Sequence, residues 1–447
     1  MSTRTARTPP SSRTPPSSRT PPSSRTPPSS GTPESSQSSR TPQRPSRSAS
    51  GAGSGPEGAP ARSKALEIQG FRGLAALSTV IFHVWQQYYR YDADGSHPPL
   101  DNPYIGSLIS LEVIDLFFVM SAYLLTLSYA RAAIDGGSLR PAGVFLFRRA
   151  IRIVPLYFIA VLVVWSSRNS TLPGNWLDLL EHLTFTHVFD REQIFYTLGP
   201  VWSLSLEIAF YLALVALGPL AVRACRPLRR RATRVAVCAG GCLVLFVLPL
   251  IWIAVARYVF DVPHTNWPVY FGPQARFGGF AAGMGLAVLM VALGERGRLR
   301  TRWAVALPAL AVAGAYSVSL DSKPENFTFT FYHPLTSLLW ALMLFGTIHT
   351  AQRMRWHGLL RARWLTYTGL VSYSLFIWHE PVMLQLHASG LLPAGQSGFP
   401  LAVLVVLLVA VPTAVLSYWV IEYPSSLLGR LKDRSGKPRD FYPELAR

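Results

Sequence analysis

The fold is decided most clearly by a stretch near the end of the chain, residues 400–421, which reads PLAVLVVLLVAVPTAVLSYWVI. It contains no charged side chain and is long enough to cross a hydrocarbon core of about 30 Å as one helix. Similar apolar runs recur from Gly73 onward, and only 15% of the chain is charged, against about 25% in a typical soluble protein. The sequence therefore predicts an all-α polytopic membrane protein.

About ten such runs are predicted to be transmembrane helices. Their expected ranges are 73–91, 105–130, 150–166, 199–222, 235–256, 268–293, 302–320, 331–350, 365–387 and 400–423. Arginines are concentrated in alternate connections, such as 223–234 and 296–302, and the connections between these are acidic or uncharged. Positive charge is retained on the cytoplasmic side, so both termini are expected in the cytoplasm. The Ala-, Arg-, Gly- and Pro-rich composition favours a bacterial cytoplasmic membrane.

Two tails flank the predicted membrane domain, which covers residues 65–430. Within residues 1–64 the unit Arg-Thr-Pro-Pro-Ser-Ser repeats from Arg7 to Ser30, and the whole segment lacks aromatic side chains, so it is expected to form a disordered cytoplasmic tail. Residues 431–447 form a short basic tail on the same side. The net charge of +19 lies in the tails and short loops, so nucleic-acid binding is not expected. The three cysteines contain no CxxC pair and predict no metal site.

Ionisable side chains inside the predicted spans are the candidate functional residues, because charge is costly at membrane depth. They are His83, Glu112, Asp115, Glu207, Arg276, His379 and Glu380, with Arg72, Arg149, Arg152 and Glu422 near the cytoplasmic boundary. At a rise of about 1.5 Å per residue, His83 lies about 15 Å past Gly73, near the midplane. It is the only histidine expected there, since His379 is expected in the outer half of the membrane.

His83 is predicted to be a general base, because neutral imidazole accepts protons efficiently near pH 7. A buried histidine that only bridges helices is the alternative. Asp115 or Glu207 would orient the imidazole, as the carboxylate of a catalytic triad does. For His379 and Glu380 a structural role is favoured, and Arg276 is expected to form an ion pair with Glu207 or Glu112.

Arg149 and Arg152 are three residues apart on one helical face, at the cytoplasmic end of the third span. They could hold the phosphate groups of coenzyme A, which is negatively charged and cytoplasmic. The alternative is that they are ordinary arginines at a cytoplasmic boundary.

Five short patterns follow one another along these spans. They are Gly70-Phe71-Arg72-Gly73-Leu74-Ala75-Ala76 with His83 downstream; Asp115-Leu116-Phe117-Phe118-Val119-Met120-Ser121; Arg148-Arg149-Ala150-Ile151-Arg152-Ile153-Val154-Pro155; Trp202-Ser203-Leu204-Ser205-Leu206-Glu207; and Tyr373-Ser374-Leu375-Phe376-Ile377-Trp378-His379, before Glu422-Tyr423-Pro424. In this order they resemble the acyltransferase-3 family of membrane-bound acyltransferases, over about residues 65–430.

The resemblance implies transfer of an acyl group, commonly acetyl, from acyl-CoA to a hydroxyl of a sugar, an envelope glycan or a glycosylated secondary metabolite such as a macrolide. It implies that His83 is the catalytic histidine, that Arg149 and Arg152 belong to a donor-binding motif, and that Arg72 is the arginine of the first motif. Arg72 is predicted to bind the donor together with Arg149 and Arg152. Acyl-CoA would be a co-substrate, with no permanently bound cofactor and no metal. The patterns add Trp202, Ser121, Tyr373 and Glu422 as further site candidates.

One departure from the family pattern concerns packing. The chain has Ser121-Ala122 where the family usually has Ser-Gly, so the methyl group of Ala122 must be accommodated at a close helix contact.

Other mechanisms and functions fit the same residues. Transfer could be direct or pass through an acyl-histidine or acyl-serine, with Ser121 as the serine. The acyl group could also pass to a separate extracytoplasmic transferase. From a different class, a secondary transporter or flippase for a glycan or small metabolite would also bury charges, although the sequence has no inverted repeat.

Overall fold

A computed structural model describes residues 58–431 except 93–94, 112, 295–297 and 351–353, with only the backbone at 58–64 and 429–431. The predicted tails, up to residue 57 and from 432 onward, lie outside the described residues, as does Glu112. The first helix begins at Gly58, before the boundary of the N-terminal tail predicted at residue 64.

The described chain consists mainly of helices, with a short β-sheet of β1 (Arg90–Asp92) and β2 (Gly95–His97) after the first helix. The helices are α1 (Gly58–Gln87), α2 (Pro103–Ile109), α3 (Ile114–Ile134), α4 (Ala142–Arg168), α5 (Trp176–Leu183), α6 (Trp202–Cys225), α7 (Arg231–Tyr258), α8 (Trp267–Phe271), α9 (Pro273–Leu293), α10 (Thr301–Leu320), α11 (Phe327–Thr330), α12 (Tyr332–Ile348), α13 (Arg355–Leu360), α14 (Arg363–Leu370), α15 (Ser372–Ala388), α16 (Phe399–Ser417) and α17 (Tyr423–Leu431).

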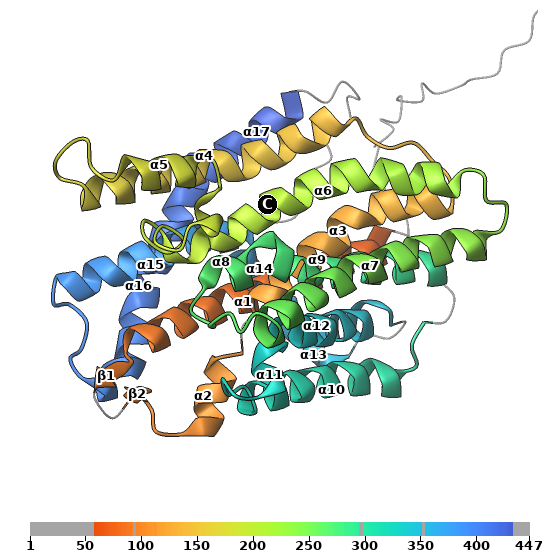
Figure 1. Ribbon diagram of the computed structural model, residues 1–447. Helices are drawn as coiled ribbons and strands as arrows, with labels where there is room; N and C mark the ends of the chain where they lie inside the picture. The colour runs from red at the N-terminus through yellow and green to blue at the C-terminus, as the bar shows by residue number, and fades with distance from the viewer. Residues whose placement is uncertain (1–57, 93–94, 112, 295–297, 351–353, 432–447) are drawn as a thin grey trace, which may run out of the picture. The chain divides into compact units, whose positions relative to one another are not determined.

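Within the described residues, 8 helical segments are long and apolar enough to cross a membrane. They lie at 65–87, 103–134, 142–168, 199–225, 231–258, 267–293, 301–320 and 396–428. The prediction of an all-α membrane protein with many spans is therefore confirmed. In Figure 1 α1, α3 and α9 lie among the other helices, with α4 and α17 along one side and α10 along the opposite side.

The other two predicted spans differ from expectation in length. The span predicted at 331–350 corresponds to α12, a shorter apolar helix of 17 residues. The span predicted at 365–387 is divided at Val371 into α14 and α15. The total of about ten spans therefore stays a prediction.

Contacts between helix ends show which ends share a side. At one end Arg231, at the start of α7, donates a hydrogen bond to Asp135, which follows α3. At the other end Ser319, near the end of α10, donates to the backbone carbonyl of Ser107 in α2. The charge pattern assigns the first group of ends to the cytoplasm and the second to the outside, so these contacts fit the predicted alternation.

The glycines of the first sequence pattern bring α1 into backbone contact with α13 and α14. A Cβ atom at Gly70 would lie 2.0 Å from the carbonyl oxygen of Leu360, and one at Gly73 would lie 2.2 Å from that of Leu365. A backbone oxygen cannot turn aside as a flexible side chain can, so only glycine fits at these positions. The contact fixes the rotation of α1 and thereby the direction of Arg72.

Ala122, at the departure from the family pattern, packs against a glycine of α9. A Cβ atom at Gly283 would lie 2.8 Å from the Cβ of Ala122 and 2.3 Å from the carbonyl oxygen of Val119. The space for the extra methyl group is therefore supplied by Gly283 on the opposite helix, and α3 and α9 still pack closely.

Candidate functional site

The structure brings six of the predicted site residues around one cavity, which we call the inner cavity and which has a volume of about 110 Å³. These residues are Arg72, Ser121, Arg149, Arg152, Glu207 and Tyr373. They come from five helices, α1, α3, α4, α6 and α15, and are far apart in the sequence. By the predicted topology, the inner cavity lies on the cytoplasmic side of the membrane.

Glu207 is the centre of a hydrogen-bond network in the inner cavity. Its Oε1 accepts hydrogen bonds from the hydroxyl of Tyr211, at 2.6 Å, and from that of Ser121, at 3.2 Å. Arg149 lies close to both Glu207 and Tyr211. The sequence analysis missed Tyr211, although it follows Glu207 by one helical turn and so shares its face.

Two residues in the first turn of α15 form hydrogen bonds beside the arginines of the inner cavity. Arg72 donates a hydrogen bond from Nη2 to the Oγ of Ser372, at 3.1 Å. The hydroxyl of Tyr373 donates to the backbone carbonyl of Ile153, next to Arg152, at 2.7 Å. Ser372 was also missed, and it ties α15 to the arginine predicted for donor binding.

Glu422 and Glu380 connect α15 to other helices. Glu422 is buried and accepts a hydrogen bond from Ser374, at 3.0 Å, at the end of the π-helical turn that follows α16. Glu380 accepts one from the backbone N–H of Gly199, at 2.8 Å, just before α6. Neither residue lines the inner cavity, and for Glu380 the contact fits the structural role that the sequence favoured.

His83 and His379 contact each other and do not line the inner cavity, although His379 follows the lining residue Phe376 by one turn of α15. Their rings have centres 4.9 Å apart, and Nε2 of His379 lies 3.1 Å from Nδ1 of His83. The prediction that His379 lies farther out than His83 is therefore wrong. The predicted span began at residue 365, whereas α15 begins at Ser372 after the break, which places His379 level with His83. Phe376 lines the cavity and has its ring centre 5.9 Å from that of His379.

Backbone carbonyl groups fix the tautomers of both histidines. Nδ1 of His83 is 2.9 Å from the carbonyl oxygen of Thr79, and Nδ1 of His379 is 2.8 Å from that of Phe376. A carbonyl oxygen only accepts hydrogen bonds, so each Nδ1 carries a hydrogen in the neutral ring. His379 therefore accepts through Nε2 from His83, and Nε2 of His83 has the lone pair that a general base requires.

The predicted acidic partner of His83 is replaced by His379. Asp115 accepts hydrogen bonds from Nδ1 of His333, at 2.9 Å, and from the hydroxyl of Thr336, at 2.8 Å. The side chain of Asp115 is therefore directed to α12, and that of Glu207 to Tyr211. The prediction that one of these carboxylates contacts His83 is therefore wrong. Asp115 is hydrogen-bonded to α12, and Glu207 is hydrogen-bonded to Tyr211 on its own helix.

Arg276 interacts with aromatic rings and a backbone carbonyl. Of the two ion-pair partners expected for it, Glu207 hydrogen-bonds to Ser121 and Tyr211. Glu112 lies outside the described residues, so its pairing with Arg276 stays a prediction. The Nε of Arg276 donates to the carbonyl of Tyr270, at 2.9 Å, and its guanidinium lies 4.3 Å from the ring centre of Phe271 and 5.4 Å from that of Trp202. Trp202 is buried between Phe271 and Phe118, a residue of the inner cavity. It therefore forms part of a wall behind that cavity.

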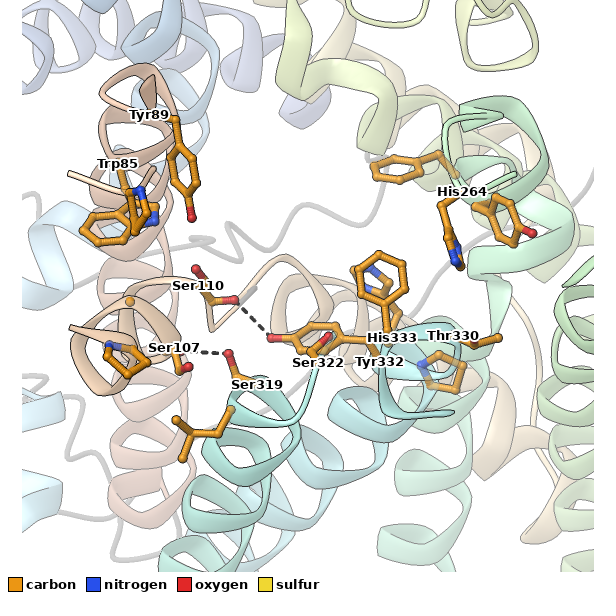
Figure 2. Close-up of a pocket in the computed structure, with 18 of the residues that line it drawn as sticks. Trp85, Tyr89, Ser107, Ser110, His264, Ser319, Ser322, Thr330, Tyr332 and His333 are labelled. Atoms are coloured by element: carbon orange, nitrogen blue, oxygen red, sulfur yellow. Dashed lines mark hydrogen bonds between the residues drawn. The ribbon is translucent and has the colours of Figure 1, made fainter. Parts of the chain in front are cut away.

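A second cavity, which we call the outer cavity, has a volume of about 480 Å³. Its lining comes from the end of α1, from α2 and α8, and from the connection between α10 and α12 (Figure 2). His333 and Arg276 line it, and Phe271 lies between it and Trp202. By the predicted topology, the outer cavity lies on the opposite side of the membrane from the inner cavity.

The comparisons with known proteins match the part of the chain that contains both cavities. A family model described as an acyltransferase domain matches residues 66–419. The chain belongs to the acyltransferase-3 family. It is 28% identical to acyltransferase MdmB of Streptomyces mycarofaciens over 408 residues, which cover 85% of this chain and 97% of that protein.

A second relative is O-acetyltransferase OatA of Staphylococcus aureus, which is 23% identical over 385 residues. That alignment covers 80% of this chain and 56% of OatA. No solved structure matches the chain. Family membership makes the chain a membrane acyltransferase and favours an enzyme over the alternative of a transporter or flippase.

Proposed function

We propose that this acyltransferase moves an acyl group from acyl-CoA to a hydroxyl group, with Nε2 of His83 accepting the hydroxyl proton. The observation that carries the proposal is the fixed tautomer of His83, set by the carbonyl of Thr79 and by Nε2 of His379. It leaves a basic nitrogen on the imidazole of His83, whose partner His379 follows Phe376 by one turn of α15, and Phe376 lines the cavity with three arginines.

The donor would bind through its negative charges. Coenzyme A carries several phosphate charges, and Arg72, Arg149 and Arg152 supply cations whose planar groups match phosphate oxygens. A volume of about 110 Å³ suits the acyl-thioester end of the donor and not its nucleotide. The nucleotide would therefore lie toward the cytoplasmic ends of α1 and α4.

The transfer step then needs one proton acceptor. The acceptor hydroxyl gives its proton to Nε2 of His83 while its oxygen forms a bond to the carbonyl carbon of the thioester. The carbon–sulfur bond breaks, and the sulfur of coenzyme A leaves with the electron pair and takes the proton back from His83. His379 accepts a hydrogen bond from the positively charged ring of His83 during this step, as the carboxylate of a catalytic triad does.

A covalent route through Ser121 is a second mechanism, and the hydrogen bond from Ser121 to Glu207 favours it. In that route Glu207 takes the serine proton while the serine oxygen bonds to the acyl carbon, the carbon–sulfur bond breaks, and the sulfur of coenzyme A takes the proton from Glu207. A later acceptor hydroxyl, in the chain's own substrate or in a separate extracytoplasmic transferase, gives its proton to Glu207 and bonds to the acyl carbon. The bond to the serine oxygen then breaks, and the serine oxygen takes that proton.

For the acceptor we propose a hydroxyl of a sugar, an envelope glycan or a glycosylated secondary metabolite such as a macrolide, and for the location the bacterial cytoplasmic membrane. The name of the relative OatA, an O-acetyltransferase, supports an acetyl donor and an oxygen acceptor. Mass spectrometry of metabolites and envelope glycans from cells with and without the gene would identify the acylated product.

The role of His83 is tested with purified protein in lipid nanodiscs and radiolabelled acetyl-CoA. His83→Ala should lower transfer by about 100- to 10,000-fold, because the proton acceptor is lost. Binding of acetyl-CoA should be retained, since the arginines are unchanged. Near-normal turnover in His83→Asn, whose amide cannot act as a base, would show that His83 only bridges helices. A Ser121→Ala variant that forms no radiolabelled protein where the wild type does would favour the covalent route.

A further inference from the structure

The outer cavity contains a histidine that is held in one orientation by a buried carboxylate. Nδ1 of His333 lies 2.9 Å from Oδ2 of Asp115, whose side chain is only 2% exposed, and the hydroxyl of Thr336 donates to the same oxygen at 2.8 Å. A carboxylate only accepts, so Nδ1 of neutral His333 carries the hydrogen and Nε2 is a hydrogen-bond acceptor. The side chain of His333 lines the cavity and is 20% exposed.

The rest of the lining combines flat aromatic rings with small polar groups. The rings include Trp85, Trp267, Tyr270 and Tyr332, and the polar groups include Asn102, Ser107, Ser110 and Ser322. A pyranose ring has the matching chemistry, because its C–H faces pack on aromatic rings while its hydroxyls exchange hydrogen bonds at the edge. The volume of about 480 Å³ is within the range of about 300–1,000 Å³ usual for small-molecule sites.

The polar side of this lining is well ordered. The hydroxyl of Tyr332 donates to the backbone carbonyl of Ser110, and that of Ser319 to the backbone carbonyl of Ser107 (Figure 2). These bonds join α2 to α10 and α12, so the walls of the outer cavity are fixed relative to His333. A preformed site of this kind loses little entropy on binding.

We propose that the outer cavity binds a pyranoside ring of the acceptor, with Nε2 of His333 accepting a hydrogen bond from a sugar hydroxyl. The proposal rests on the proposed function only in naming the bound sugar as the acceptor. Asp115 is then a positioning residue, because it holds the imidazole of His333. The acceptor would then bind on one side of the aromatic wall of Trp202 and Phe271, and the donor would bind on the other side.

Binding can be measured without a donor, by saturation-transfer NMR on the full chain in lipid nanodiscs. The probes are methyl β-D-glucopyranoside, methyl β-D-galactopyranoside and methyl α-L-rhamnopyranoside. Ser107→Leu and Ser110→Leu fill the outer cavity and leave its framework unchanged, because both of the bonds described above use backbone carbonyls. Ser317→Leu is the matched control, since Ser317 is exposed on α10 and does not line the cavity.

At least one neutral glycoside should bind the wild type and the Ser317→Leu control. Its affinity should fall at least about tenfold in Ser107→Leu, Ser110→Leu and His333→Asn. No binding of any neutral glycoside, or equal binding in the filled variants, would overturn the proposal. Binding of acetyl-CoA to the same variants should be unchanged. If His83 is not the general base, His83→Ala would keep its acyl-transfer activity, and sugar binding to the outer cavity would be retained.

Discussion

Nε2 of His379 lies 3.1 Å from Nδ1 of His83, and this contact joins two helices that run in the same direction. The direction follows from a second contact, between Arg72 and Ser372. Arg72 precedes His83 on α1, and Ser372 likewise precedes His379 on α15. α1 and α15 therefore run parallel to each other, as the predicted alternation of loops requires. The site depends on the register between these two helices.

His379→Ala should lower the turnover of acyl transfer by roughly 100-fold, less than the loss in His83→Ala. The loss is smaller because the carbonyl of Thr79 still fixes the tautomer of His83, while the charged ring loses its acceptor. The KM for acetyl-CoA should stay unchanged, which separates this effect from a loss of donor binding. His379→Gln, whose side-chain oxygen can accept the same hydrogen bond, should recover part of the turnover. A helix-bridging role alone would leave turnover in His379→Ala near the wild-type value.

The double variant Arg149→Gln and Arg152→Gln should bind acetyl-CoA at least about tenfold more weakly, because two charge-assisted contacts to phosphate are lost. Titration of the purified protein by calorimetry measures this affinity. The matched control is Arg229→Gln with Arg230→Gln, two exposed arginines in the connection before α7. Equal affinity in both double variants would assign Arg149 and Arg152 to membrane anchoring.

Gly73→Ala should destabilise the protein by about 1–3 kcal/mol, because the new methyl group would overlap the carbonyl oxygen of Leu365. The separation of α1 from α14 that relieves the overlap would also displace Arg72 from Ser372, so donor affinity should fall. Thermal unfolding in detergent and acetyl-CoA titration give the two values. Gly143→Ala is the control, since a Cβ at Gly143 has no neighbour within 4 Å. Equal melting temperatures for both variants would contradict the close contact.

The orientation of the membrane domain can be tested by cysteine labelling in intact cells. The native cysteines, Cys225, Cys238 and Cys242, are buried, so exposed single replacements report their own position. Asp101→Cys should react with a membrane-impermeant maleimide from outside, and Arg229→Cys only after the membrane is opened. The reverse pattern would place the inner cavity outside the cell.

The folded protein should lose stability as the pH falls below about 6.5, because of His187 in the connection between α5 and α6. His187 is buried against His182, with ring centres 4.1 Å apart, and burial followed by the nearby His182 lowers its pKa to about 3. The unfolded chain binds a proton near its ordinary pKa of about 6.5, whereas the folded chain does not. Stability is therefore fully present above that pH and falls by up to about 1.4 kcal/mol per pH unit below it.

Thermal unfolding between pH 8 and pH 5 measures this dependence. His187→Gln should flatten it, while the exposed His387→Gln should leave it unchanged. An unchanged slope in His187→Gln would show that groups other than His187 set the pH dependence.

The sequence predicted the elements that depend on long apolar runs and on charge. Burial of ionisable groups is so costly that their positions in the sequence mark Arg72, Arg149, Arg152 and Glu207 as site residues, and the inner cavity contains all four. Neutral polar residues carry no such signal. Ser372 and Tyr211 were missed for this reason, although each contacts one of the charged residues.

The errors arose at helix boundaries. The break between α14 and α15 falls at Val371, which is neither a glycine nor a proline, so the sequence did not signal it. This break brings His379 level with His83. His333 is the second residue of α12, in a stretch where a loop and a helix start look alike in sequence. Its pairing with Asp115 depends on the angle between α3 and α12, which hydropathy does not encode.

The separation of His83 and His379 along the chain affects how the protein is made. The two residues are 296 positions apart, so at about 5–20 residues per second a ribosome needs about 15–60 s to add the second after the first. During that interval α1 is already inserted, with Arg72, Thr79 and His83 on one polar face and no α15 to cover them. The insertion machinery or another early helix must shield this face, and a nascent chain that stops before Ser372 is a natural substrate for membrane proteases.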